Sequence, residues 1–127
     1  MNTEKFTQKS IEALSAAHEF ALKYKHTNIK NEHLILALIG QMNGLIPKLL
    51  EKMGKNTPAL IDRIEKDLSL LPTVDTLNPN NIYMDRDLND SLNEAEKTAE
   101  EMENSYISVE HLFMAMLKNK ILKVLLM

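Results

Sequence analysis

Apolar residues recur every three or four positions over most of the chain, which is the spacing that predicts amphipathic helices. Thr7 and Asn31 are expected to cap the first two helices, and Thr57, which precedes Pro58, is expected to cap the fourth. The predicted fold class is therefore all-α. The expected helices span 6–25, 31–39, 45–53, 57–71, about 85–103, 108–118 and a last segment from about Lys120 to the end.

Residues 71–83 break this helical pattern. The segment contains Pro72 and Pro79 among asparagine and threonine residues, and proline disfavours a helix both at its own position and at the preceding one. We expect a linker here between two helical halves, 6–70 and 84–127. A chain of 127 residues has the usual length of one domain, so we expect residues 1–127 to form a single domain.

The two halves resemble each other in sequence. A shift of 78 residues places Phe6–Ile39 on Met84–Leu117 without a gap, and both copies contain the pattern Ile-x-x-Glu-His-Leu-x-x-Ala. We expect two similar four-helix units packed about a pseudo-twofold axis. In this register the second unit stops within a helix at Met127, so we expect the chain to be part of a longer protein. The predicted core leucines are Leu14, Leu34, Leu92 and Leu112.

Composition and charge exclude several classes of function. Hydrophobic residues make up 44% of the chain, and there are no cysteines, which excludes disulfides, thiolate metal sites and a cysteine nucleophile. The net charge of −3 argues against a nucleic-acid partner. We find neither an apolar run long enough to span a membrane nor a signal peptide, so we expect a cytoplasmic protein without a membrane partner.

Negative charge is concentrated between Asp85 and Glu110. This stretch contains nine acidic residues against Arg86 and Lys97. One interpretation is a solvated helix face, and the other is a surface that attracts basic segments of a partner.

No catalytic, metal or phosphate motif is complete. His18-Glu19 begins a zinc-protease pattern, but Leu22 stands where the second histidine is required. Asp85-x-Asp87 imitates a calcium loop that lacks its essential glycine. The three glycines do not form a phosphate-binding loop. We expect a chain that is not an enzyme by itself and that holds no metal or cofactor.

The repeated motifs resemble a known family. Phe6-Thr7, Ala13-Leu14-x-x-Ala17 and the doubled Ile-x-x-Glu-His-Leu pattern are similar to the Clp N-terminal domain, which precedes the AAA+ ATPase rings of Clp/Hsp100 unfoldases. Leu70-Leu71-Pro72-x-Val74 is more similar to the ClpB disaggregase branch than to the ClpC branch.

The resemblance implies a substrate- and adaptor-binding domain of an ATP-dependent chaperone. ATP and Mg²⁺ would bind in modules beyond Met127, and the whole protein would be hexameric. The implied partners are unfolded or aggregated polypeptides, adaptor proteins and, through the parent protein, a Clp protease. A phosphoarginine or adaptor docking domain of a ClpC-type unfoldase and a standalone helical regulator are the alternatives.

The resemblance also implies site residues. In the ClpB branch, polar residues at helix starts bind polypeptide beside an apolar groove, and Thr7 and Glu110 match them, while Asn104 replaces an acidic residue. In the ClpC branch, the positions of Glu32 and Glu110 receive the guanidinium of phosphoarginine, aided by a threonine at each helix start. Asp85 stands in place of the second threonine.

Other positions of the implied site have simpler explanations. Glu94, Thr98 and His111 stand at groove positions where the disaggregase branch usually has leucine. We expect His33 and His111 to make local hydrogen bonds. A carboxylate in the first turn of a helix, such as Glu32, is also stabilised by the helix dipole alone.

Overall fold

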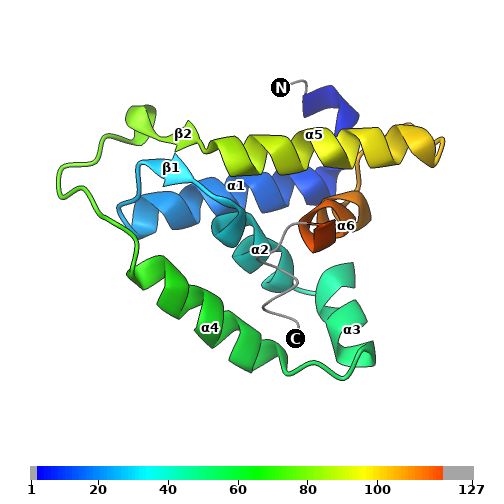
Figure 1. The fold of residues 1–127 in the computed structure, drawn as a ribbon, viewed down its shortest axis with the longest axis horizontal. Helices are drawn as coiled ribbons and strands as arrows, with labels where there is room; N and C mark the ends of the chain where they lie inside the picture. The colour runs from blue at the N-terminus through cyan, green and yellow to red at the C-terminus, as the bar shows by residue number, and fades with distance from the viewer. Residues whose placement is uncertain (1–2, 119–127) are drawn as a thin grey trace.

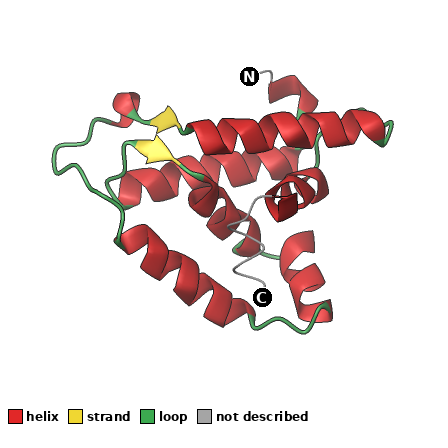
Figure 2. Ribbon diagram, in the orientation of Figure 1, coloured by secondary structure: helices red, strands yellow, loops and turns green. Residues whose placement is uncertain are grey.

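The computed structural model describes residues 3–118, and within them the chain folds into helices with two very short strands (Figures 1 and 2). This confirms the all-α prediction, whereas the helix expected from Lys120 lies outside the described residues. The helices are α1 Gln8–Lys23, α2 Asn31–Ile39, α3 Leu45–Lys52, α4 Thr57–Ser69, α5 Arg86–Glu101 and α6 Val109–Lys118. The strands are β1 Asn28–Ile29 and β2 Tyr83–Met84, and the 3₁₀ turns are η1 Thr3–Lys5 and η2 Pro79–Asn81.

Helix α2 is the centre of the packing. It contacts α1, α3, α4, α5 and α6, and all its residues except Glu32 are buried. A helix that is apolar on every face is stable only when other helices surround it. The continuous run from Leu34 to Ile39 therefore explains why α2 lies at the centre.

The other helices each bury one face. Helix α1 packs mainly on α2 and α5 packs on α6, while α4 covers another side of α2. Small buried residues, such as Ala17 in α1 and Ala95 in α5, allow close approach of the helices. The bulk of the core is aliphatic and includes Leu34, Leu38, Ile46, Leu50, Ile64, Leu68, Leu88, Leu92, Leu112 and Met116.

Parallel backbone pairing links each half to the other. Strand β1 pairs with β2, in the register Asn28 with Tyr83 and Ile29 with Met84. A single parallel bridge joins Phe6 to Ile107 in the same way. The residues before α1 therefore lie beside the residues before α6, and the residues before α5 lie beside those before α2 (Figure 1).

The hydrogen bonds confirm the internal repeat. Thr7 N–H donates to the Ile107 carbonyl at 3.0 Å, and its counterpart Asp85 N–H donates to the Ile29 carbonyl at 2.9 Å. The bonds that end α1 recur at the end of α5: His26 N–H donates to Ala21 at 2.8 Å and Asn104 N–H to Ala99 at 2.9 Å. Lys25 and Glu103, which are also counterparts, both have positive φ, at 60° and 58°.

Two cap predictions were wrong by one residue. Lys30, not Asn31, is the N-cap of α2. The backbone N–H of Lys30 donates a hydrogen bond to His33 Nδ1, in the first turn of the helix, at 2.8 Å. Asn56, not Thr57, caps α4, and its side chain accepts from Ala59 N–H at 3.1 Å.

Residues 71–83, the predicted linker, contain η2 and the first residue of β2, and two-residue strands have no periodicity that a sequence pattern could reveal. One core prediction needs correction. Leu14 is half-buried against the core instead of being part of it, whereas the other three predicted core leucines are buried. Burial also differs at one apolar pair of the repeat, since Met114 is 38% exposed and its counterpart Leu36 is 6% exposed.

Candidate functional site

A hollow of about 300 Å³ lies between the starts of α1 and α6, and we call it the Thr7–Glu110 hollow. The bridge between Phe6 and Ile107 brings these two helix starts together, although they lie about a hundred residues apart in the chain. Lys9 and the loop before α3 complete the wall. The lining residues are Thr7, Lys9, Gln41, Asn43, Gly44, Leu45, Ser108, Val109 and Glu110.

Thr7 is held firmly at one side of this hollow. It is the predicted N-cap of α1, and its Oγ1 accepts from Ser10 N–H at 3.3 Å. Thr7 Oγ1 also donates to Ser10 Oγ at 3.0 Å, and Ser10 Oγ donates to the Ile107 carbonyl at 3.0 Å. The hydroxyl therefore has a structural role, whatever it binds in addition.

Glu110 lies at the other side of the hollow and is exposed. Ser108 Oγ donates to Glu110 Oε2 at 3.0 Å, which orients the carboxylate in the first turn of α6. A carboxylate at this position is stabilised by the helix dipole and can still bind a cation. Leu45 and Val109 add apolar surface beside it, so the hollow can accept a side chain with an apolar stem and a positive end.

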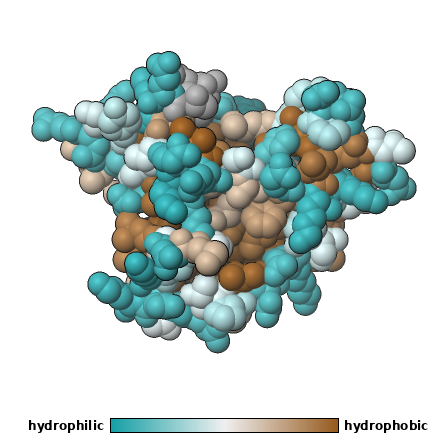
Figure 3. All heavy atoms as spheres, turned by 180° about the vertical axis from the view of Figure 1, so that it is seen from behind, coloured by the Kyte–Doolittle hydropathy of each residue, from teal (hydrophilic) through white to brown (hydrophobic). Residues whose placement is uncertain are grey.

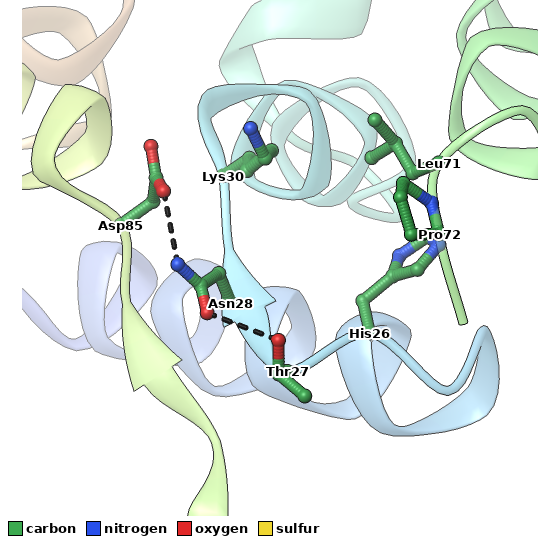
Figure 4. A pocket seen from close by; sticks show the side chains of 7 residues that line it. All are labelled: His26, Thr27, Asn28, Lys30, Leu71, Pro72 and Asp85. Atoms are coloured by element: carbon green, nitrogen blue, oxygen red, sulfur yellow. Dashed lines mark hydrogen bonds between the residues drawn. The ribbon is translucent and has the colours of Figure 1, made fainter. Parts of the chain in front are cut away.

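A second hollow, of about 270 Å³, lies beside the start of α5 and the segment between α1 and α2 (Figure 4). We call it the Asp85–Lys30 hollow, because the repeat makes Asp85 the counterpart of Thr7 and Lys30 the counterpart of Ser108. Its lining residues are His26, Thr27, Asn28, Lys30, Leu71, Pro72 and Asp85.

The Asp85 carboxylate in this second hollow is already engaged. Asn28 Nδ2 donates to Asp85 Oδ1 at 3.1 Å, and Asp87 N–H donates to Asp85 Oδ2 at 3.3 Å. The hydrogen bond from Asn28 lowers the pKa of Asp85. The negative charge therefore persists where the first half has a neutral hydroxyl, so the two hollows differ in electrostatics.

The other two candidate residues lie outside both linings. Glu32 is half-buried in the first turn of α2, where burial raises its pKa. Asn104 is exposed, and its Oδ1 accepts from His111 Nε2 at 2.9 Å. The structure thus brings Thr7 and Glu110 together and places Glu32 and Asn104 elsewhere.

The histidines of the repeated motif make the expected local hydrogen bonds. His33 Nδ1 accepts from Lys30 N–H at 2.8 Å, and His111 Nδ1 accepts from Ser108 N–H at 2.9 Å. The proton of each ring is therefore on Nε2. His33 Nε2–H donates to His26 Nδ1 at 2.9 Å, and the equivalent nitrogen of His111 donates to Asn104, which is the counterpart of His26 in the repeat.

Glu94 and Thr98, which stand where the disaggregase branch usually has leucine, both have local partners in this structure. Thr98 is buried and its hydroxyl donates to the Glu94 carbonyl at 2.9 Å, while the Glu94 carboxylate pairs with Lys118 at 2.6 Å.

Seen from behind, apolar surface gathers in the middle of the molecule, with hydrophilic side chains around it (Figure 3). Ile11, Leu14 and Phe20 of α1 are among the half-buried apolar residues that pack on the core.

Sequence reasoning missed several residues of the Thr7–Glu110 hollow. Leu45 and Lys9 gave no signal, because only the approach of α3 and α1 to α6 makes them neighbours of Glu110. Ser108 could have been found, because it precedes the repeated Glu-His pair at the position where serine favours a helix start.

Within residues 3–118, no group of three or more His, Cys, Asp or Glu side chains is placed to hold a metal ion. No helix in the same part of the chain combines the length and the apolar character that crossing a membrane requires.

Comparison with known proteins defines the class of this helical repeat. The family model described as the Clp repeat (R) N-terminal domain matches residues 5–126. The chain therefore belongs to the Clp N-terminal repeat domain family. It is 36% identical over 120 residues to the chaperone protein ClpB of Nitratidesulfovibrio vulgaris and 36% identical over 119 residues to that of Clostridium perfringens. These alignments cover 93% and 92% of this chain, but only 14% of each chaperone.

Solved structures show the same fold at lower identity. The Hsp104 N-terminal domain from Candida albicans has a TM-score of 0.86 at 18% identity, covering 95% of this chain and 79% of the other. The N-terminal domain of the ClpV1 ATPase from E. coli has a TM-score of 0.82 at 22% identity, covering 94% of this chain and 71% of the other.

Proposed function

We propose that this chain is the substrate-binding domain of an ATP-dependent ClpB-type chaperone, and that unfolded polypeptide binds at the Thr7–Glu110 hollow. The observation that carries the proposal is the meeting of Thr7 and Glu110, from different halves, in one hollow with apolar walls. Adaptor proteins and a Clp protease acting through the parent protein are further partners of the same proposal.

The chemistry of the hollow favours basic and apolar segments. Leu45 and Val109 supply apolar contact, and Glu110 supplies an exposed negative charge beside it. The acidic stretch from Asp85 to Glu110 adds attraction for cationic segments, which salt screens beyond about 8–10 Å. Ordering a flexible segment costs conformational entropy, so we expect weak and reversible binding.

The parent protein would supply the rest of the activity. In this proposal ATP and Mg²⁺ bind in AAA+ modules outside this chain, in a hexameric and cytoplasmic chaperone. The chain itself then needs no cofactor, and its task is to capture polypeptide for those modules. The share of the ClpB relatives that the chain spans, 14%, supports this division of roles.

Fluorescence anisotropy with a labelled 15-residue peptide of alternating leucine and arginine tests the proposal. Glu110→Gln should weaken binding several-fold and lower the melting temperature only slightly, because Glu110 is exposed and the change removes no buried contact. Asp85→Asn is the matched control at a helix start in the acidic stretch, and it should leave binding nearly unchanged. Equal binding by the wild-type chain and Glu110→Gln would refute the site.

A phosphorylated arginine side chain is a second candidate ligand for this hollow. Glu110 can accept the guanidinium, while Lys9 and the start of α1, which also line the hollow, can attract the phosphate. A peptide with one phosphoarginine should then compete with the labelled peptide better than its unphosphorylated form. Competition of equal strength by the two forms would leave only the unfolded-polypeptide function.

A further inference from the structure

Within residues 3–118, helix α3 exposes an apolar face that is not packed into the core. Ile46 and Leu50 are 0% exposed and bury one side of the helix in the core. Leu45 and Leu49 and the C-cap residue Met53, spaced four residues apart, are 46%, 37% and 46% exposed. Residues four apart lie on one face of a helix, so these three side chains form a continuous stripe. We call Leu45, Leu49 and Met53 the α3 stripe.

The α3 stripe differs from the outward face of the neighbouring helix α4. The outward positions of α4 include Asp62, Glu65 and Lys66, as expected for a helix that packs on the core through one face only. Met42, in the loop before α3, is 85% exposed and adds a further apolar side chain near its start. Contiguous apolar surface on a soluble protein is typical of interaction sites.

Two lysines give the α3 stripe a charged border. Lys48 lies three residues after Leu45, and Lys52 lies three residues after Leu49, so each is next to the stripe on the helix surface. Both lysines are exposed, and neither forms an ion pair within residues 3–118. Glu51 is two residues after Leu49 and therefore does not share its face.

We propose that the α3 stripe docks an acidic amphipathic helix of a partner protein, with carboxylates directed at Lys48 and Lys52. Apolar side chains at helical spacing would cover Leu45, Leu49 and Met53, as in helix-in-groove recognition. The preferred charge is opposite to that of the Thr7–Glu110 hollow, which attracts basic segments. The two surfaces meet only at Leu45, so they can be separated by substitutions at Leu49 and Met53.

Nuclear magnetic resonance titration of the isotope-labelled 127-residue chain tests the proposal. The probe is an 18-residue designed helix with leucines at every third or fourth position and glutamates on one flank. Saturable shifts of α3 amides are expected. The variant Leu49→Gln/Met53→Gln should bind the probe at least about tenfold more weakly, because it loses apolar contact at the centre of the stripe. Glutamine is a good helix former, so the helix should persist.

Charge reversal provides a matched pair of controls. Lys48→Glu/Lys52→Glu should no longer bind the acidic probe, and should instead bind the same designed helix with lysines in place of glutamates.

Met102→Gln, at an apolar residue that is 52% exposed at the end of α5, should bind like the wild-type chain. The leucine–arginine peptide should bind Leu49→Gln/Met53→Gln normally, which distinguishes failure here from failure of the proposed function.

Several outcomes would overturn the proposal. Equal affinity of the acidic and basic probes for the wild-type chain would show non-specific apolar adhesion. Shifts confined to other helices, or no saturation at millimolar probe, would remove the site. Self-association that disappears in Leu49→Gln/Met53→Gln would assign the stripe to a second copy of this chain instead of an acidic partner.

Discussion

Acid should destabilise the domain through one buried pair of histidines. His33 is 0% exposed and His26 is 3% exposed, and His33 Nε2–H donates to His26 Nδ1 at 2.9 Å. Tyr24 stacks on the His26 ring at 5.6 Å between centroids, and His26 Nε2 is buried. An added proton on His26 Nδ1 would face the Nε2 proton of His33, so protonation breaks the bond.

The pKa shifts set the direction and the size of the effect. Burial, together with the neighbouring His26 and Lys30, lowers the pKa of His33 from 6.5 to about 4. The unfolded chain therefore binds more protons than the folded chain between pH 6.5 and about 4, so stability falls as the pH falls through this window. From pH 7.5 to 5, His33 alone removes about 2 kcal/mol. The lowered pKa of His26 acts in the same direction.

Carboxylates have little influence at the acid end of this comparison. The pKa of Asp85 is lowered from 3.8, so its contribution is lost only below pH 5. Burial raises the pKa of Glu32 above 4.5, and a raised carboxyl pKa opposes the histidine effect, because the folded chain then binds the extra proton more strongly. The lowered pKa of Glu94, which is caused by its hydrogen bond with Lys118, acts in the same direction as that of Asp85, so measurement at pH 5 reports mainly the histidine contribution.

Urea unfolding followed by circular dichroism at pH 7.5 and 5 measures this loss. His33→Gln should lose most of the pH dependence, although it is less stable at pH 7.5. His26→Asn copies the arrangement of Asn104 with His111, since its side-chain oxygen can accept from His33, and it should reduce the dependence without abolishing it. A wild-type chain equally stable at both pH values, or an unchanged loss in His33→Gln, would refute the reasoning.

Two further predictions concern the core and nucleotide. Leu34→Ala should lower the free energy of unfolding by about 2–5 kcal/mol, because the side chain is 0% exposed, whereas Leu70→Ala, at a residue 75% exposed, should leave the urea midpoint unchanged. Calorimetric titration of the 127-residue chain with ATP should show no binding, since the sequence has no phosphate-binding loop, and micromolar affinity would overturn the placement of nucleotide outside this chain.

Local signals and the internal repeat could be recognised in the sequence alone. The apolar spacing located the described helices to within about two residues, because an amphipathic helix needs one apolar face whatever it packs against. The match of Ile29–Ala37 with Ile107–Ala115 predicted the two halves, and the paired hydrogen bonds confirm them. Thr7 was correctly predicted as a cap, since its hydroxyl acts within one helical turn.

Contacts between the halves were decided only by the tertiary structure. Strands of two residues have no periodicity, so nothing in the sequence indicated that Phe6 lies beside Ile107 or Tyr83 beside Asn28. That pairing places Thr7 with Glu110, and the approach of α3 adds Leu45 to the same hollow.

Burial of polar residues was likewise decided by packing. The four histidines look scattered in the sequence, yet the turn after α1 brings His26 to within 2.9 Å of His33. The repeat placed an asparagine at the counterpart of His26, but sequence comparison could not show that both side chains accept the same kind of bond. Which polar side chains leave the solvent depends on how helices far apart in the chain close over them, and this is a property of the folded domain.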